Sequence, residues 1–246
     1  MRRIWPDPAP LDEAGLLRAY AVERDSGPRV RMNFVTSLDG AVEVDGYSRG
    51  LSDPADQQVL HTLRVHADAV MVGAGTLRHE GYGGLRLNED DHRQRRAQGL
   101  APDPTLVIVS SSLDLQPEHK VFTHAPVRPV VLTHGGAPSD RLAALSTVAD
   151  IVVCGDTVVD PAIGLAELRA RGLDQVLCEG GPHLFGALLA ADQVDELCLT
   201  LSAKLAGSGA GRIVADGRRD VPLRMRLVHV IASDDTLLTR YARVRE

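Results

Sequence analysis

The stretch Asp68-Ala69-Val70-Met71-Val72-Gly73-Ala74-Gly75-Thr76 is a short apolar run that ends in small and hydroxyl-bearing residues. A run without polar alternation is typical of a strand that is buried on both faces of a parallel sheet. The preceding residues, 54–65, are predicted to form a helix, because Ser52 or Asp53 can cap it and Pro54 suits its first turn. A helix followed by a buried strand indicates an α/β fold.

The same alternation continues through most of the chain. Strands are expected at 30–36, 69–73, 105–110, 129–133, 151–154 and 175–178. Further helices are expected at 139–145, between Asp160 and Gly172, and at 182–189. After Val194 the pattern changes to strands at 197–201, 224–231 and 237–244, with a hairpin turn at Asp234-Asp235. We therefore predict an α/β fold with a mostly parallel central sheet, helices on both faces, and a C-terminal antiparallel hairpin at the sheet edge.

Two less regular stretches do not divide the chain into separate cores. Residues 1–28 are predicted to form an irregular arm with one short helix around Glu13 to Tyr20. Residues 88–104 carry charges of both signs and fit either a linker or one exposed helix. We expect an N-terminal arm, 1–28, and a single domain, 29–246.

The composition excludes several classes of protein. The 246 residues are 44% hydrophobic and 24% charged, which is typical of a globular protein. A net charge of -6 and an aromatic content of 3% argue against nucleic-acid binding. The sequence has no apolar run long enough to span a membrane, and its start has no apolar signal segment. A cytoplasmic protein is expected.

The cysteines and histidines give no sign of a metal site. Cys154, Cys178 and Cys198 are far apart and lie in apolar runs, so they are expected to be buried thiols in a reducing compartment. The histidines lack metal-ligand spacing and are expected on the surface or in loops, His66 among them. No metal is predicted.

Small, polar and glycine-rich residues follow four of the predicted strands. In an open parallel sheet, ligands bind outside the carboxyl ends of the strands, so these residues predict a binding site. The four segments are Thr36-Ser37-Leu38-Asp39-Gly40, Gly73-Ala74-Gly75-Thr76, Ser110-Ser111-Ser112 and Glu179-Gly180-Gly181-Pro182.

Three of these segments fit parts of a dinucleotide, although each also fits an ordinary turn. Gly180-Gly181-Pro182 lets the backbone approach a ligand and starts a helix whose free N–H groups can bind a pyrophosphate. Gly73-Ala74-Gly75-Thr76 offers a hydroxyl to phosphate or ribose, but Arg78 stands where the dinucleotide fingerprint needs glycine. The hydroxyls of residues 110–112 can bind a ribose 2′-phosphate, or simply cap a loop.

Two charged residues are candidates for substrate binding. Arg64 ends the first long helix, where it either complements the helix dipole or binds a substrate phosphate. Glu179 follows a buried strand and is expected to be partly buried at the sheet edge. Its carboxylate either binds the N–H groups of a heterocycle or makes a structural hydrogen bond.

Together these residues resemble the reductase domain of riboflavin biosynthesis, which is the C-terminal half of the bifunctional deaminase–reductase (the RibD C-terminal domain family). That domain is similar in fold to dihydrofolate reductase. The resemblance rests on residues 36–40, 63–64, 68–76, 179–182 and 194–197. It implies an NADPH-dependent reductase of 5-amino-6-(5-phosphoribosylamino)uracil, with hydride transfer to ribose C1′, and a homodimer.

The resemblance also implies roles by position. Substrate contacts would come from Ser48, Arg64, Arg86 and Glu179, with the arginines on the phosphate. Glu179 and Asp56 are the candidates for a catalytic group. Cofactor contacts would come from Thr36, Gly50, Gly73, Thr76, Glu80, Ser111, Gly180, Gly181, Pro182, His183, Leu184, Phe185, Gly186 and Ala187.

The sequence departs from the family pattern at several points. The zinc signature of the deaminase is absent, so only the reduction is expected. The family's lysine four residues before Ser37 is Asn33, its tryptophan is Gly50, and its aspartate after Thr76 is Glu80. These changes alter the pocket beside the nicotinamide.

Two alternatives therefore stay open. Asp56 lies where dihydrofolate reductases carry their pterin-binding acid, which suggests a dihydrofolate or pterin reductase. An acidic residue in a first helical turn is also favoured simply by the helix dipole. The second alternative is a regulator that binds NADPH without catalysis.

Overall fold

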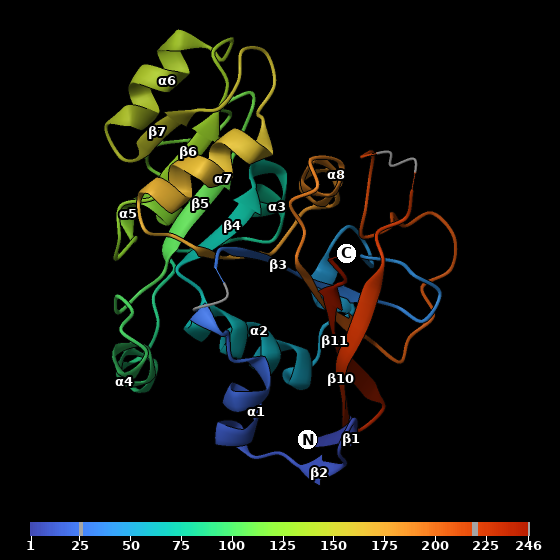
Figure 1. The fold of residues 1–246 in the computed structure, drawn as a ribbon. Helices are drawn as coiled ribbons and strands as arrows, with labels where there is room; N and C mark the ends of the chain where they lie inside the picture. Colours follow the sequence, from blue (N-terminus) through green and yellow to red (C-terminus); the bar gives the residue numbers. More distant parts are fainter. Residues whose placement is uncertain (25–26, 218–220, 246) are drawn as a thin grey trace.

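One mixed sheet of eleven strands runs through the residues that the computed structural model describes, namely 1–24, 27–217 and 221–245 (Figure 1). Its order is β2-β1-β10-β11-β9-β3-β8-β4-β5-β6-β7. The strands from β9 to β7 are parallel, and the pairs from β9 through β11, β10 and β1 to β2 are antiparallel. The predicted α/β class is thus confirmed. Residues 25–26 of the expected arm, and 218–220 and 246 of the expected domain, lie outside the described residues.

The parallel strands fall within a residue or two of their predicted positions. They are easily recognised because helices cover both faces, which makes them nearly continuous apolar runs. They are β3 (Arg29–Thr36), β4 (Ala69–Gly73), β5 (Thr105–Val109), β6 (Val130–Thr133), β7 (Asp150–Val153), β8 (Gln175–Cys178) and β9 (Glu196–Leu201).

The C-terminal hairpin is present, but it does not form the edge of the sheet. Strands β10 (Met225–Ser233) and β11 (Thr236–Arg243) pair as predicted. However, β1 (Arg2–Trp5) pairs with β10, and β2 (Ala9–Pro10) lies outside β1. The expected irregular arm therefore contributes two strands. Short, charged β1 covers the backbone edge that β10 would otherwise expose.

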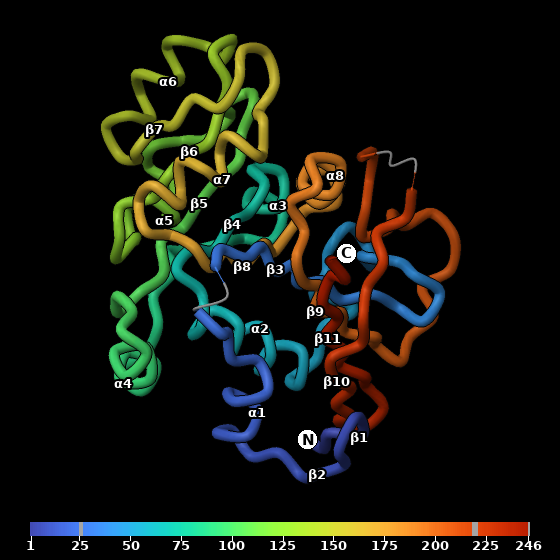
Figure 2. Tube along the Cα trace, viewed as in Figure 1, coloured from blue at the N-terminus to red at the C-terminus, as the bar shows by residue number. Residues whose placement is uncertain are grey.

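Helices lie on both faces of the sheet (Figure 2). The buried side chains form two hydrophobic cores. The first core contains Leu16, Leu63 and Leu145, and the second contains Leu168 and Leu188. The first core is covered by α1 (Glu13–Tyr20), α2 (Pro54–His66), α5 (Lys120–Thr123) and α6 (Ser139–Ser146), and the second by α7 (Pro161–Ala170) and α8 (Pro182–Ala190). Three shorter or peripheral elements are the 3-10 helix η2 (Ser48–Gly50), α3 (Ala74–His79) and α4 (Glu89–Ala97).

The sequence predicts either a linker or one exposed helix for residues 88–104, and the structure shows a helix, α4. One side of this helix is buried. Asn88 caps it, and Arg95 is only 1% exposed. Nη1 of Arg95 donates to the carbonyl oxygens of Arg64 and Ala67 at 3.0 and 2.6 Å. Burial lowers the pKa of Arg95 to about 10. Arg95 therefore fixes the C-terminal end of α2, which carries Arg64 into the site described below.

The three cysteines are buried and free, as predicted. His66 differs from its prediction, because it is only 5% exposed, on the buried face of α2. Its ring nitrogens pair with Gln98 Oε1 and the Leu17 carbonyl oxygen. His229 on β10 is also buried. Across the described residues there is no metal-ligating group of three or more side chains, and no helix could cross a membrane.

Candidate active site

Strands β3, β8, β4 and β5 are parallel neighbours, so the segments that follow them lie at one edge of the sheet. Two cavities open along this edge. The larger has a volume of about 860 Å³ and the smaller about 430 Å³. Both are lined by Gly73, Gly75, His183 and Leu184, so they adjoin along the end of β4 and the start of α8. The segments after β8, β4 and β5 line these cavities, whereas no residue of the fourth predicted segment, 36–40, lines either of them.

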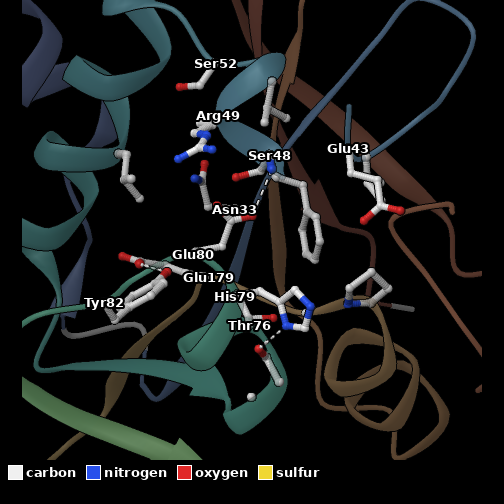
Figure 3. A pocket seen from close by; sticks show the side chains of 18 of the residues that line it. Asn33, Glu43, Ser48, Arg49, Ser52, Thr76, His79, Glu80, Tyr82 and Glu179 are labelled. Atoms are coloured by element: carbon white, nitrogen blue, oxygen red, sulfur yellow. Dashed lines mark hydrogen bonds between the residues drawn. The ribbon is translucent and has the colours of Figure 1, made fainter. Parts of the chain in front are cut away.

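Arg64, Glu179 and Tyr82 form a cluster of side chains that lines the larger cavity. Figure 3 shows two of them, Glu179 and Tyr82, close together. Nε and Nη2 of Arg64 each donate to a different carboxylate oxygen of Glu179, both at 2.6 Å. The Tyr82 hydroxyl donates to Glu179 Oε2 at 2.7 Å. The Glu179 side chain is 3% exposed and that of Arg64 is 24% exposed. The sequence analysis selected Arg64 and Glu179 separately, and the structure brings them into direct contact.

The positive charge of Arg64 and the negative charge of Glu179 balance within the cluster. Burial by itself lowers the pKa of Arg64, but the Glu179 carboxylate outweighs burial and raises the pKa above its ordinary value. Burial, followed by the charge of Glu179, raises the pKa of Tyr82 well above its ordinary value, so this hydroxyl remains a donor. The Glu179 side chain is almost fully buried and that of Arg64 is partly exposed, so a ligand in the cavity can meet more of Arg64 than of Glu179.

The turn after Glu179 brings backbone, not side chains, to the cavity. Gly180 has φ +97°, a conformation that favours glycine. A Cβ on Gly181 would lie 2.5 Å from Thr76 Oγ1, so only glycine fits against Thr76 without a shift. Gly181 is also the N-cap of α8 and has no side-chain cap. The first turn of α8 has backbone N–H groups without partners inside the helix, and Gly180 and Gly181 have no side chains to block an approach. Both features suit a pyrophosphate, which the sequence predicts at this position.

The serine segment after β5 borders the smaller cavity. The hydroxyls of Ser110 and Ser112 accept hydrogen bonds from the backbone N–H groups of Leu113 and Asp114, at 3.1 and 3.4 Å. Ser111 is exposed and lines the cavity together with Arg78 and Ala187. The capping interpretation is therefore confirmed for Ser110 and Ser112. Binding of a 2′-phosphate at this segment stays a prediction, for which Ser111 is the residue in a suitable place.

Asp56 lies in the first turn of α2 and lines the larger cavity, although it is only 5% exposed. Its Oδ2 accepts a hydrogen bond from the Ser52 hydroxyl at 2.5 Å. Burial raises the pKa of Asp56, and hydrogen bonds from Ser52 and Thr200 oppose this only in part. A carboxyl group with a raised pKa next to a ligand cavity can hold a proton or pair with a basic ring nitrogen.

Glu80 and Ser48, which the resemblance assigned to cofactor and substrate, are bound to each other. Glu80 Oε1 accepts a hydrogen bond from the backbone N–H of Ser48 at 2.8 Å. Both residues line the larger cavity. This contact fixes η2, which contains Arg49, to the end of α3. Arg86 also lines the cavity and is exposed.

Five of the expected cofactor residues do not line either cavity as the described residues form them. Thr36 is buried, and the Gly50 carbonyl accepts a hydrogen bond from Lys204 Nζ. Phe185 stacks on Phe34, with ring centroids 5.3 Å apart. Gly180 and Gly186 complete this set. Their cofactor contacts remain a prediction.

The sequence analysis missed Tyr82, Arg49 and His79, all of which line the larger cavity. Tyr82 stands in Gly81-Tyr82-Gly83-Gly84, where an isolated aromatic residue among glycines was the available signal.

The fold and the two adjoining cavities define an α/β protein whose cavities lie at the carboxyl edge of its sheet, where open parallel sheets bind their ligands. The pattern of the RibD C-terminal domain family matches residues 28–239, and the chain belongs to this family.

Several named proteins are similar to the chain. It is 31% identical over 193 residues to the 2,5-diamino-6-ribosylamino-4(3H)-pyrimidinone 5′-phosphate reductase of Methanothermobacter thermautotrophicus, covering 77% of this chain and 84% of that protein. It is 32% identical over 181 residues to the riboflavin biosynthesis protein RibD of Mycobacterium tuberculosis, covering 72% of this chain and 49% of that protein.

Among solved structures, a pyrimidine reductase-like protein from Corynebacterium diphtheriae superposes with a TM-score of 0.82 and 28% identity. The superposition covers 89% of this chain and 93% of that chain. Relatives with pyrimidine reductase names therefore share both the sequence pattern and the fold.

Proposed function

We propose that the chain is an NADPH-dependent reductase of a ribosylaminopyrimidine 5′-phosphate in riboflavin biosynthesis. The single observation that carries this proposal is the pair of adjoining cavities at the ends of β3, β8, β4 and β5, one bordered by the Gly181 turn and one by Ser111. Such a continuous site suits a long dinucleotide beside a second small molecule. The names of the relatives supply the reaction class.

The cofactor assignment is supported by the chemistry of the residues present. The backbone of Gly181 and the start of α8 would hold the pyrophosphate, and Thr76 would contact the adjoining part of the dinucleotide. Ser111 and Arg78, which both border the smaller cavity, would bind a ribose 2′-phosphate. When bound, the reduced nicotinamide supplies the hydride. The chain's own part is to bind and orient.

The substrate phosphate would bind arginines other than Arg64. The Arg64–Glu179 pair carries no net charge, whereas Arg49 and Arg86 line the same cavity and make no ion pair with any described carboxylate. We therefore place the phosphate at Arg49 and Arg86, and the heterocycle against the Arg64–Glu179–Tyr82 cluster.

A second candidate is a dihydrofolate or pterin reductase. Buried Asp56 on the cavity wall favours it, because a carboxyl group can pair with an aminopyrimidine or pterin ring. An Asp56→Asn variant would then lose turnover of the pterin.

The experiment is to mix the protein with NADPH and, separately, with three substrates, and to follow the absorbance of the reduced nicotinamide. The substrates are 2,5-diamino-6-ribosylamino-4(3H)-pyrimidinone 5′-phosphate, 5-amino-6-(5-phosphoribosylamino)uracil and dihydrofolate. Oxidation of NADPH with either pyrimidine supports the proposal. Turnover of dihydrofolate alone supports the second candidate. Cofactor binding without any turnover supports a non-catalytic NADPH-binding regulator.

The proposal includes a cytoplasmic homodimer, as the resemblance implies. Sedimentation equilibrium at several protein concentrations measures the oligomeric state, and a monomer at all of them contradicts this part.

A further inference from the structure

Glu43 differs from the other carboxylates on the wall of the larger cavity in how its charge is used. Four carboxylate side chains line this cavity. Glu179, Glu80 and Asp56 each accept a hydrogen bond from another residue of the chain. Glu43 is half-buried, and no hydrogen bond or ion pair joins its carboxylate to any residue that the structure describes. Its negative charge is therefore available to a ligand.

The loop that carries Glu43 is held on both sides of this residue. The backbone N–H of Val42 donates to the Gly211 carbonyl oxygen at 3.3 Å, and the backbone N–H of Val44 donates to the Tyr47 carbonyl oxygen at 3.0 Å. Because both neighbours are bonded, the backbone of Glu43 is fixed in place. Rotation about its side-chain torsions is then enough to turn the carboxylate toward a bound molecule.

This loop lies on the side of the cavity that borders the start of α8. Gly211, whose carbonyl group holds the loop, begins the segment 211–215. The backbone N–H of Ala215 donates to the Pro182 carbonyl oxygen at 3.1 Å, so this segment also contacts the first turn of α8. Gly211, Ala215 and Pro182 all line the larger cavity together with Glu43.

The position of Glu43 indicates which part of the cofactor it meets. Figure 3 shows Glu43 on one side of the cavity and Glu179 with Tyr82 on the other. Under the proposed function, the pyrophosphate lies at Gly181 and the substrate heterocycle lies at the Arg64–Glu179–Tyr82 cluster. The nicotinamide is joined to the pyrophosphate through its ribose and has to reach the substrate. It therefore lies between these two positions, in the part of the cavity that Glu43 borders.

A negative charge beside a nicotinamide acts differently on the two oxidation states of this ring. Transfer of a hydride, with both bonding electrons, to the substrate changes the ring from neutral to singly positive. A carboxylate a short distance away attracts the positive ring much more strongly than the neutral one. The same attraction acts on the partial positive charge that develops during the transfer.

We propose that the Glu43 carboxylate faces the nicotinamide of the bound cofactor and stabilises the oxidised, positive ring over the reduced, neutral one. This inference rests on the proposed function, to which it adds a residue that favours hydride transfer through its charge. Glu43 belongs neither to the polar segments that the sequence analysis selected nor to the residues that the resemblance implies.

The test compares wild type and Glu43→Gln by calorimetric titration with NADPH and with NADP⁺, both without substrate. Glutamine keeps the size of glutamate and removes its charge. We expect the dissociation constant of NADP⁺ to rise about fivefold, which corresponds to two unit charges about 4 Å apart in water. The dissociation constant of NADPH should stay within about twofold, because its ring is neutral.

Three controls isolate the charge at this position. Glu43→Asp keeps the charge and should keep the ratio of the two dissociation constants. Asp45→Asn removes a charge from an exposed residue of the same loop that lines neither cavity, so it should also keep the ratio. Asparagine tolerates the φ of +53° at this position. Adenosine 2′,5′-bisphosphate, which lacks the nicotinamide, should bind wild type and Glu43→Gln equally.

The outcomes decide the inference. An unchanged ratio in Glu43→Gln overturns it, and so does an equal change of the ratio in Asp45→Asn. Equal changes for NADPH, NADP⁺ and the bisphosphate would place Glu43 at the phosphates and also overturn it. A wild type that shows the expected difference but oxidises NADPH with neither pyrimidine contradicts the proposed reaction and leaves Glu43 in place. A wild type that binds neither nucleotide overturns both.

Discussion

Arg64, in the last turn of α2, and Glu179, directly after β8, form a two-point ion pair with both distances at 2.6 Å. An arginine–carboxylate pair of this geometry fixes orientation as well as distance. The pair ties the end of a helix to the edge of the sheet at the side of the larger cavity. A change in either residue therefore displaces the other.

Glu179→Gln is expected to reduce turnover much more than NADPH affinity. The variant removes the charge that compensates partly buried Arg64, and breaking such a pair costs about 3 kcal/mol of unfolding free energy. Turnover should fall at least about tenfold, because Arg64 and residue 179 would no longer hold each other in the position that orients the heterocycle. Steady-state kinetics and NADPH titration measure the two effects. Glu167→Gln, at an exposed position of α7, is the control, and equal losses of turnover and cofactor affinity would show that Glu179 is misplaced.

Tyr82→Phe removes only the hydroxyl that donates to Glu179. The two Arg64 contacts remain, and the hydroxyl acts on the substrate only by orienting Glu179. We therefore expect the KM for the pyrimidine to rise about fivefold, less than for loss of a direct hydrogen bond to a charged group. The value of kcat and the affinity for NADPH should stay near those of the wild type. Tyr241→Phe on β11 is the matched control. An unchanged KM would mean that the Tyr82 hydroxyl does not help to orient Glu179.

Acid should destabilise the protein through His229. Burial, reinforced by the cations Arg240 and Arg31, lowers the pKa of His229 from 6.5 to about 4. Between these two values the unfolded chain binds more protons than the folded protein, so the free energy of unfolding falls as the pH falls. The loss reaches about 3 kcal/mol by pH 4.

Urea unfolding at a series of pH values checks this dependence. His229→Phe should flatten the curve between pH 6.5 and 4, apart from the part due to His66, whose pKa is also lowered by burial. Replacing exposed His124 with glutamine should leave the slope unchanged. A slope that persists in full in His229→Phe would assign the effect to other groups.

NADPH should stabilise the protein against heat more than NADH does. Ser111 is exposed at the smaller cavity, where a 2′-phosphate would lie. Ser111→Ala should weaken NADPH binding about fivefold and leave NADH unchanged, since only NADPH carries the phosphate. Thermal shifts with each nucleotide measure the difference, with Ser146→Ala on α6 as the control. A larger shift with NADH in the wild type would refute the assignment.

Much of the parallel half of the fold could be predicted, because each strand is a local apolar run and the helices carry local signals. Asp53 and Asp160 cap α2 and α7 as expected, and each is followed by proline at the first position. The convergence of the polar segments then followed from one rule about parallel sheets.

The features that were missed depend on partners far away in the sequence. Strand β1 is short and charged, and only its pairing with β10 makes it a strand. Arg95 looks like a surface residue of a charged helix, but the carbonyl groups at the end of α2 hold it inside. The Arg64–Glu179 contact spans 115 positions, and no local pattern reports it.

The central strand β3 lies between β8 and β9, which are formed from residues 175–201. The ribosome synthesises β3 long before β8 and β9. During most of translation β3 therefore lacks the two strands with which it pairs in the folded sheet. Assembly of the sheet must therefore wait until the chain beyond Leu201 has emerged. We therefore expect the nascent protein to benefit from chaperones that shield exposed apolar segments.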